Sequence, residues 1–278
     1  MEKELRHIKI NGVLIIVYLI ILVIIFPVSS EATPKAGEEN VEQTTEVAVS
    51  VKYELPKMAN KKVPEKLVEH VGYTVSFNTQ HNIPNWVAYD LTSEEVAGVT
   101  PRAKHFEPDP QIIGCPTTDD YKNSGYDRGH MAPAGDMKWS EQAMTESFHL
   151  SNICPQNHNL NGGDWKALEE HLRTMATQYE KVYIACGPII SANPKTIGLN
   201  HQVAVPDAFY KAILRKKGDT WSAIGFMMPN QAGHKKLSTY AMSVEELEII
   251  TNMDFFYNLP DDIEEQVESS YQLTDWNL

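Results

Sequence analysis

The chain has 278 residues, of which 42% are hydrophobic and 22% are charged, a composition that is typical of a globular protein with a buried core and excludes a collagen-like or fully disordered chain. The formal net charge of −13 at pH 7 argues at first against a polyanionic partner. However, the acidic excess is concentrated at the chain ends. Residues 254–278 hold seven acidic side chains and no lysine or arginine, and residues 51–253 are nearly neutral. Net charge therefore leaves nucleic acid open as a partner.

The N-terminus has the order of segments that is typical of an export signal. Three basic residues, Lys3, Arg6 and Lys9, precede the uncharged apolar run 13–26, and small residues follow it. Because a bilayer span needs about 20 apolar residues, this run is short for a transmembrane helix. We predict that residues 1–28 are a signal peptide or a retained signal-anchor. In both cases the folded part is exported across the cytoplasmic membrane and is then secreted, periplasmic or membrane-anchored with the domain outside.

Residues 29–62 are predicted to form a disordered linker, because the stretch 29–50 is polar, acidic and nearly free of aromatic side chains. The remainder, residues 63–278, is predicted to be one folded domain. The odd number of cysteines and their wide spacing indicate neither a disulfide framework nor a CxxC metal site. These cysteines are Cys115, Cys154 and Cys186, and the sequence leaves their pairing open.

The first half of the domain predicts strands and a long loop. Residues 73–80 and 85–92 alternate apolar and polar side chains, as half-buried strands do. Residues 100–127 are rich in proline, aspartate and threonine, and we expect them to form a functional loop. Residues 147–156 are predicted to form a short strand that enters a turn.

The second half predicts two helices and more strands. Residues 164–180 place apolar side chains at helical spacing with charges on the opposite face, which indicates an amphipathic helix. Further strands are predicted at 181–190, 201–216 and 220–230. Residues 243–251 are predicted to form a short helix, in which Ser243 and Glu246 make a capping box. Strands mixed with a few helices, without strict βαβ alternation, predict an α+β domain.

The motif DRGH, residues 127–130, places an acid, a guanidinium and a titratable imidazole together. By itself such a set is often only a turn beside a structural histidine. About thirty residues downstream stands a run of amides, followed on the predicted helix by Glu169 and Arg173, which lie four apart on one face. The amides are Asn152, Gln156, Asn157, Asn159 and Asn161. Simpler explanations stay open: turn chemistry for the amides, and for Glu169 and Arg173 a surface ion pair worth about 0–1 kcal/mol.

Together these segments resemble the DNA/RNA non-specific endonuclease family, the DRGH nucleases. The resemblance rests on DRGHMAPAGDM, on LSNICPQ with LNGGDWKALE, and on further blocks in family order such as NWVAYDLT, YIACGP and DFFYNLPDD. It covers roughly residues 68–268. It implies a central antiparallel β-sheet flanked by helices, with a ββα-metal active-site motif. The implied activity is Mg²⁺-dependent endonucleolytic hydrolysis of DNA and RNA with little sequence preference, giving 5′-phosphate ends.

The family motif also implies residue roles. By this match His130 is the general base, which suits an imidazole with an ordinary pKa of about 6.5. Asn161 is the protein ligand of Mg²⁺, because an amide oxygen is a suitable hard donor, and Mn²⁺ is an expected substitute. Glu169 fixes metal-bound waters. Arg102 clamps the scissile phosphate with its planar guanidinium.

The remaining matches have supporting roles. Arg173 is a secondary basic position, and Asp127 and Arg128 are expected to hold the catalytic imidazole of His130 in place. Gly129 is expected to allow a turn or a close backbone approach. Asn152 is expected to bind substrate or to support the structure. The implied partners are DNA and RNA, with membrane contact only through the N-terminal segment, and a homodimer is left open.

Two other functions are compatible with the same residues. One is a phosphodiesterase of the same fold that acts on another extracellular diester. The other is a membrane-tethered protein that binds or takes up nucleic acid with weak or no hydrolysis, although the near-neutral middle of the chain offers few basic contacts for metal-free binding. Several histidines show neither HExxH nor Cys₂His₂ spacing, so the sequence predicts no zinc site. They are His149, His158, His171, His201 and His234.

Overall fold

The computed structural model describes residues 51–278. The predicted signal segment, residues 1–28, and most of the predicted linker lie outside the described residues. Strand β1 (Lys57–Met58) pairs with strand β13 (Met253–Asp254), so the folded domain extends to the N-terminal side of the predicted boundary at residue 63. Within the described part of the chain, no helix is long and apolar enough to cross a membrane.

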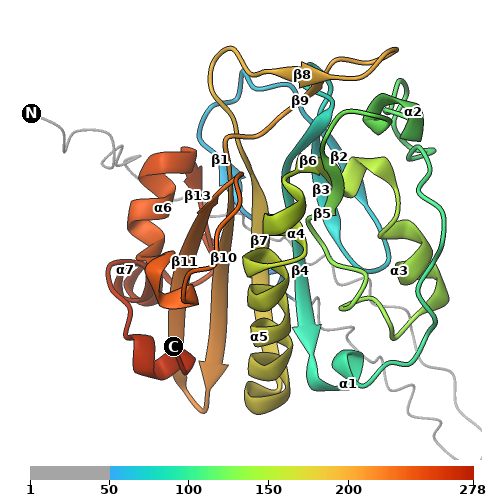
Figure 1. Ribbon diagram of the computed structural model, residues 1–278. Coiled ribbons are helices and arrows are strands. Elements are labelled where there is room, and N and C mark those ends of the chain that lie inside the picture. Colours follow the sequence, from blue (N-terminus) through green and yellow to red (C-terminus); the bar gives the residue numbers. More distant parts are fainter. Residues whose placement is uncertain (1–50) are drawn as a thin grey trace, which may run out of the picture. The chain divides into compact units, whose positions relative to one another are not determined.

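The centre of the domain is a seven-stranded sheet in which every neighbouring pair of strands is antiparallel (Figure 1). The strand order across the sheet is β12-β11-β10-β7-β4-β3-β2. In chain order these strands are β2 (Lys66–Glu69), β3 (Thr74–Asn78), β4 (Ile83–Thr92), β7 (Lys181–Ile189), β10 (Ala208–Lys217), β11 (Thr220–Pro229) and β12 (Ala241–Met242). The expected α+β fold with a central antiparallel sheet is therefore confirmed.

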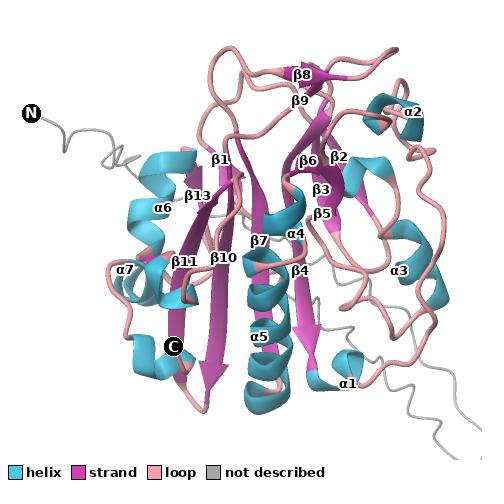
Figure 2. Ribbon diagram, in the orientation of Figure 1, coloured by secondary structure: helices cyan, strands magenta, loops and turns pink. Residues whose placement is uncertain are grey.

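Helices lie on both faces of this sheet (Figure 2). The α-helices are α1 (Ser93–Val96), α2 (Thr118–Tyr121), α3 (Glu141–Glu146), α4 (His158–Asn161), α5 (Asp164–Tyr179), α6 (Val244–Thr251) and α7 (Asp261–Glu268), and the 3₁₀ helices are η1 (Leu150–Asn152), η2 (Leu237–Thr239) and η3 (Leu273–Trp276). Helix α5 packs on one face, against β4, β7 and β10, and α6 packs on the other face.

The two faces are built by the alternation of side chains along each strand. On β4, Val87, Tyr89 and Leu91 join the core that contains the apolar side of α5. Trp86 and Ala88, which point the other way, join a second core with α6 and α7. The sheet is therefore covered on both sides, and most side chains of the central strands β4, β7 and β10 are buried.

Most predicted elements have counterparts in the structure. The strands expected at 85–92, 181–190 and 220–230 correspond to β4, β7 and β11, and the helix expected at 164–180 is α5. The capping box is present, since Ser243 Oγ accepts from the Glu246 amide at 3.1 Å. The segment 201–216 is divided into β9 (Val203–Ala204), which pairs with β8 (Thr196–Ile197), and β10. Pro206, which has no N–H to donate to a ladder, lies between β9 and β10.

A second, two-stranded sheet carries the DRGH motif. Strand β5 (Asp127–His130) pairs with β6 (Ile153–Gln156), and α4 follows directly. The register sets Gly129 opposite Cys154. A Cβ at position 129 would lie only 2.1 Å from Oε1 of the buried Gln156, so this position requires glycine because of a close approach.

We expect Gly129→Ala to destabilise the domain by about 1–3 kcal/mol, because the added methyl group must displace the buried Gln156 side chain. Urea unfolding of the purified chain measures the change. Gly162→Ala is the matched control, since a Cβ there would meet its nearest neighbour at an ordinary 3.5 Å. Equal stability losses in the two variants would contradict this account of Gly129.

Candidate active site

Five residues singled out in the sequence line a single cleft of about 340 Å³. Arg102 comes from the loop after α1, and His130 is the last residue of β5. Asn161 is the last residue of α4, and Glu169 and Arg173 lie on α5. The fold therefore brings together residues that are spread over three separate segments of the chain.

The imidazole of His130 is held in an apolar, buried position. Its ring centroid lies 5.3 Å from that of Phe106 and 4.9 Å from that of Phe148. Its backbone carbonyl accepts a hydrogen bond from the Trp165 indole at 3.3 Å, which ties β5 to α5. Burial, together with the positive charge of Arg102, lowers the pKa of His130 to about 3. The imidazole is therefore neutral at physiological pH, and its Nε2 has no hydrogen-bond partner in the described domain.

Asp127 orients Asn161 and not His130. The carboxylate Oδ2 of Asp127 accepts from Asn161 Nδ2 at 2.9 Å and lies 3.0 Å from His158 Nδ1. This contact fixes the amide with its nitrogen toward Asp127, and no described residue hydrogen-bonds to Asn161 Oδ1. The expectation that Asp127 holds the imidazole in place is therefore wrong, because the side chain is turned toward α4.

Arg128 also makes no direct contact with the imidazole of His130. The side chain is exposed, and its guanidinium lies 4.7 Å from the centroid of the Phe106 ring, whose other contacts include the His130 ring. Arg128 can therefore influence His130 only through the aromatic ring between them. Its exposed position, beside Asp127 and Asn161 in a second hollow of about 570 Å³, suits contact with an anion.

The carboxyl group of Glu169 is partly buried and makes no hydrogen bond or ion pair with any described residue. Burial, with a smaller contribution from the neighbouring Asp136, raises the pKa of Glu169 to about 7 against the opposing positive charges of Lys211, Arg173 and Arg102. A bound cation would favour the ionised form. Glu169 is therefore suited to act beside a divalent metal ion.

Arg173 is fixed by a buried carboxylate. Its Nη1 donates to Asp136 Oδ1 at 2.6 Å, and Asp136 Oδ2 accepts from the Tyr89 hydroxyl at 2.9 Å. The simple ion pair between Glu169 and Arg173, which the sequence left open, is not formed. Arg173 instead presents a preorganised guanidinium to the cleft.

Arg102 and Asn152 have different surroundings. The exposed Arg102 has its guanidinium 5.0 Å from the centroid of Phe148, the same ring that packs on His130. Asn152 is fully buried, accepts from the Ala132 amide at 2.9 Å and donates to the carbonyls of Ala132 and Ser147. Asn152 therefore supports the structure and is out of reach of a substrate.

Sequence reasoning missed several residues that shape the cleft. Asp136 closely follows the DRGH motif, and its place in the block GDM was a usable signal. Phe106 and Phe148 carry no motif that indicates contact with an imidazole. Lys166 lines the cleft, and Lys211 is fully buried behind it. A lysine inside an apolar strand was a signal, but its neighbours could not be known before the fold.

The cleft fits a hard divalent cation. The amide oxygen of Asn161 is free and oriented, and the Glu169 carboxyl is available to hold metal-bound waters. A site with one protein oxygen and several waters suits Mg²⁺, which gives up its waters reluctantly.

Residues 55–262 match the family model described as DNA/RNA non-specific endonuclease. The mitochondrial nuclease EXOG of Danio rerio is 37% identical over 70% of this chain and 62% of its own length. The mitochondrial endonuclease G of Homo sapiens is 32% identical over 75% of this chain and 73% of its own length. This chain thus spans less than two thirds of the length of the EXOG relative.

A solved structure is similar to this chain in both fold and sequence. The crystal structure of the EndoG/EndoGI complex, which concerns the mechanism of EndoG inhibition, contains a chain that is 32% identical to this one with a TM-score of 0.66. The alignment covers 70% of this chain and 87% of that chain. On the strength of the family model, the relatives and the shared fold, this chain belongs to the DNA/RNA non-specific endonuclease family.

Proposed function

We propose that this chain is an Mg²⁺-dependent endonuclease that hydrolyses phosphodiester bonds of DNA and RNA with little sequence preference and leaves 5′-phosphate ends. The observation that carries the proposal is the single cleft in which a neutral buried imidazole, a free amide oxygen, a carboxyl group and two guanidinium groups meet. A phosphodiester needs these groups: a base for water, a cation site and fixed positive charge.

His130 takes the proton of the attacking water. Its ring is neutral, so one of its two nitrogens offers a lone pair, and the two phenylalanine rings restrict its rotation. Arg102 and Arg173 bind phosphate oxygens in forked hydrogen bonds, and the latter keeps its orientation through Asp136. Positive charge beside the imidazole also opposes protonation of the ring before substrate binds.

Asn161 and Glu169 hold the cation. Asn161 offers Oδ1 because Asp127 engages its nitrogen, and Glu169 fixes metal-bound waters. A bound Mg²⁺ would neutralise negative charge that develops on the phosphodiester during hydrolysis. Mn²⁺ is expected to replace it, since both are hard cations with oxygen ligands.

The folded domain is further proposed to act outside the cytoplasmic membrane. The support is the basic, apolar and small-residue order of residues 1–28. N-terminal sequencing of the protein recovered outside the cytoplasm tests this. Recovery of the chain only from the cytoplasm, with Met1 still in place, would contradict export.

The catalytic role of His130 predicts that His130→Ala lowers the rate of plasmid and RNA cleavage by about 10²–10⁴-fold, the usual contribution of a general base. Cleavage by the unaltered chain should require Mg²⁺ and stop in EDTA. His105→Ala, a change of an exposed histidine in the Arg102 loop, is the control and should keep its activity. Undiminished cleavage by a folded His130→Ala variant would remove the proposed base.

The orientation of Asn161 by Asp127 predicts that Asp127→Ala raises the Mg²⁺ concentration for half-maximal activity by about 10–100-fold. The reason is that the amide loses the partner that fixes its nitrogen. An Mg²⁺ titration of the cleavage rate measures this. His158→Ala removes the other partner of Asp127 and should leave the Mg²⁺ requirement nearly unchanged; equal shifts in both variants would refute the orienting role.

The raised pKa of Glu169 predicts a pH-dependent stability in the metal-free protein. The unfolded chain releases this proton near pH 4.5 and the folded chain only near pH 7, so the folded state loses stability as pH rises through this window. In EDTA, the free energy of unfolding of Glu169→Gln should therefore exceed that of the unaltered chain by up to about 3 kcal/mol at pH 8. At pH 4 the two free energies of unfolding should differ little. Denaturant unfolding at the two pH values measures this.

Glu170→Gln is the control for this measurement, because Glu170 is an exposed neighbour on the same helix. It should show no comparable dependence on pH. If the difference in unfolding free energy between Glu169→Gln and the unaltered chain is the same at both pH values, burial does not raise the pKa of Glu169.

A further inference from the structure

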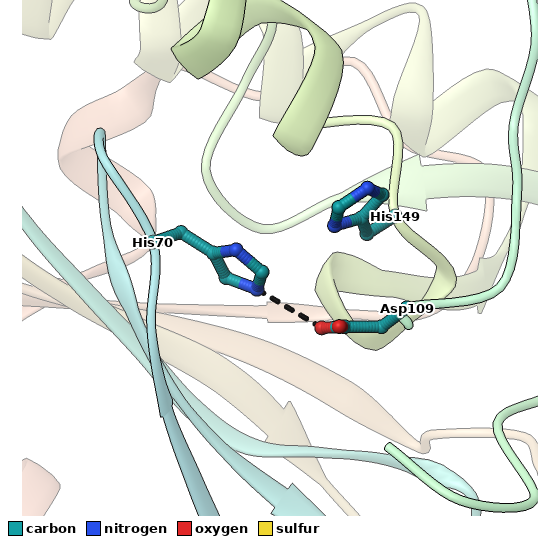
Figure 3. Close-up of side chains that lie close together, drawn as sticks. All are labelled: His70, Asp109 and His149. Carbon is teal, nitrogen blue, oxygen red and sulfur yellow. Dashed lines mark hydrogen bonds and ion pairs between the residues drawn. The ribbon is translucent and has the colours of Figure 1, made fainter. Parts of the chain in front are cut away.

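Three potential metal ligands meet outside the cleft. Figure 3 shows the side chains of His70, Asp109 and His149 facing one another from three separate loops. His70 follows β2, Asp109 lies in the long loop before α2, and His149 precedes η1. One ligand atom from each residue lies within 4.8 Å of the others, and at most 7% of each residue is exposed. None of the three lines the proposed catalytic cleft.

The Asp109 carboxylate is held in place beside the two imidazoles. Its Oδ2 lies 2.9 Å from His70 Nε2 and accepts a hydrogen bond from the Ser151 hydroxyl at 2.6 Å. Its Oδ1 accepts from the Gln111 amide at 2.9 Å. The orientation of the carboxylate is therefore fixed within the cluster.

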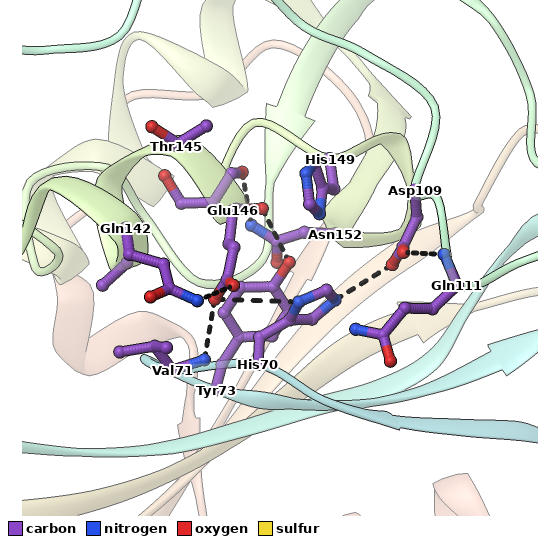
Figure 4. Close-up of polar contacts among 12 residues, drawn as sticks. His70, Val71, Tyr73, Asp109, Gln111, Gln142, Thr145, Glu146, His149 and Asn152 are labelled. Carbon is purple, nitrogen blue, oxygen red and sulfur yellow. Dashed lines mark hydrogen bonds and ion pairs between the residues drawn. The ribbon is translucent and has the colours of Figure 1, made fainter.

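Each histidine has one nitrogen toward the cluster and one toward an outer carboxylate. For His70 the outer carboxylate is Glu146 (Figure 4). His70 Nε2 lies 2.9 Å from Asp109 Oδ2, and its Nδ1 lies 3.8 Å from Glu146 Oε2. His149 Nε2 lies 3.5 Å from Glu107 Oε1, whereas its buried Nδ1 has no hydrogen-bond partner in the described domain. Histidines that bind metals in proteins usually direct the other ring N–H to a carboxylate or carbonyl. Here the two carboxylates lie on that side of each ring, but neither makes a hydrogen bond to it, and His70 Nδ1 has no hydrogen-bond partner in the described domain.

The outer carboxylate of Glu146 is itself fixed. It accepts hydrogen bonds from the Val71 amide at 2.7 Å and from Gln142 Nε2 at 2.8 Å (Figure 4). This places a fixed negative charge 3.8 Å from His70 Nδ1. Nδ1 of His70 and Nδ1 of His149 are both buried without a hydrogen-bond partner in the described domain. A hydrogen-bonded His–Asp pair alone leaves the second of these unexplained, because a buried polar atom normally has a partner.

We propose that His70 Nε2, Asp109 Oδ2 and His149 Nδ1 bind one Zn²⁺ ion, in a structural site separate from the catalytic cation. Two imidazoles and a carboxylate suit zinc better than Mg²⁺. With metal–ligand bonds of about 2.0–2.2 Å, tetrahedral ligand atoms lie roughly 3.4 Å apart, so side-chain rotations must close the cluster by about an ångström. Zinc binding through Nε2 requires the neutral His70 tautomer with its proton on Nδ1, on the side of Glu146. The proton between Nε2 and Asp109 therefore moves to Nδ1 when the ring is neutral, and leaves to solvent when the ring is protonated. Water or the nearby Ser151 hydroxyl fills the fourth position.

The location gives this site a structural role. Phe148 packs on His130 and directly precedes His149 in the chain. Glu107 forms a β-bridge with His149. It directly follows Phe106, the other aromatic residue beside His130. A metal ion there links β2 to the two loops that carry the aromatic walls of the imidazole. No local sequence pattern indicates this metal site, because the two histidines are far apart along the chain and belong to no zinc motif.

The test is a zinc titration of the purified full chain, stripped with EDTA and returned to a buffer with excess Mg²⁺, which occupies the hard oxygen site. We expect about one equivalent of Zn²⁺ to bind tightly and to raise Tm by several degrees. Co²⁺ used as a probe should show the intense visible bands of a four-coordinate site, which a water-rich six-coordinate ion lacks. Absence of zinc binding, or only weak six-coordinate Co²⁺ spectra, would overturn the proposal.

His149→Gln keeps most of the side-chain volume but removes a proposed zinc ligand. Loss of a residue that only hydrogen-bonds to a ligand weakens metal binding by roughly 10–100-fold, so we expect a larger loss of zinc affinity here. His81→Gln, a change at a partly exposed histidine outside the cluster and the cleft, should bind zinc as the unaltered chain does. Unchanged zinc affinity in His149→Gln would show that the cluster is a hydrogen-bonded His–Asp pair only. The result does not depend on nuclease activity, so it stands or falls separately from the proposed function.

Discussion

The pairing of β5 with β6 is the interaction on which the rest of the site depends. It places His130 at the end of a two-stranded sheet, and the indole of Trp165 then joins that end to α5, the helix that carries Glu169. The close approach of Gly129 to Gln156 leaves no room for a larger side chain at position 129. Because these contacts are buried and specific, a small change in the hairpin would move the imidazole relative to the metal-binding amide.

Local charge explains how a strongly acidic chain can be suited to an anionic substrate. Lys211 is fully buried behind the cleft, donates to the Met131 carbonyl at 3.2 Å and lies 4.4 Å from the centroid of the Trp165 ring. The positive charge of Lys211 lowers the pKa of the Glu169 and Asp136 carboxyl groups, against the opposing effect of burial. With the arginines of the cleft, it makes the site locally cationic, while the acidic excess lies elsewhere in the sequence. Total charge is therefore a poor guide to the ligand of this chain.

The sequence predicted what is encoded locally or in a motif. Periodicity located β4 and α5, and the motif residues His130, Asn161 and Glu169 do reach one cleft. The role of Asp127 was misjudged because adjacency along the chain suggested contact with the nearby imidazole, whereas strand alternation and the turn into α4 direct it to Asn161. The aromatic rings around His130, the anchoring of Arg173 and the histidine–aspartate cluster depend on long-range packing, which no local pattern records.

The central claim is that His130 and Asn161 act from two sides on one phosphodiester with a cation beside the amide. The most direct test is a crystal structure of the protein with Mn²⁺ and a non-cleavable oligonucleotide, in which anomalous scattering locates the metal. The account predicts a metal peak within bonding distance of Asn161 Oδ1 and a phosphate between that metal and His130. A metal bound elsewhere in the cleft, or a phosphate out of reach of the imidazole, would contradict it.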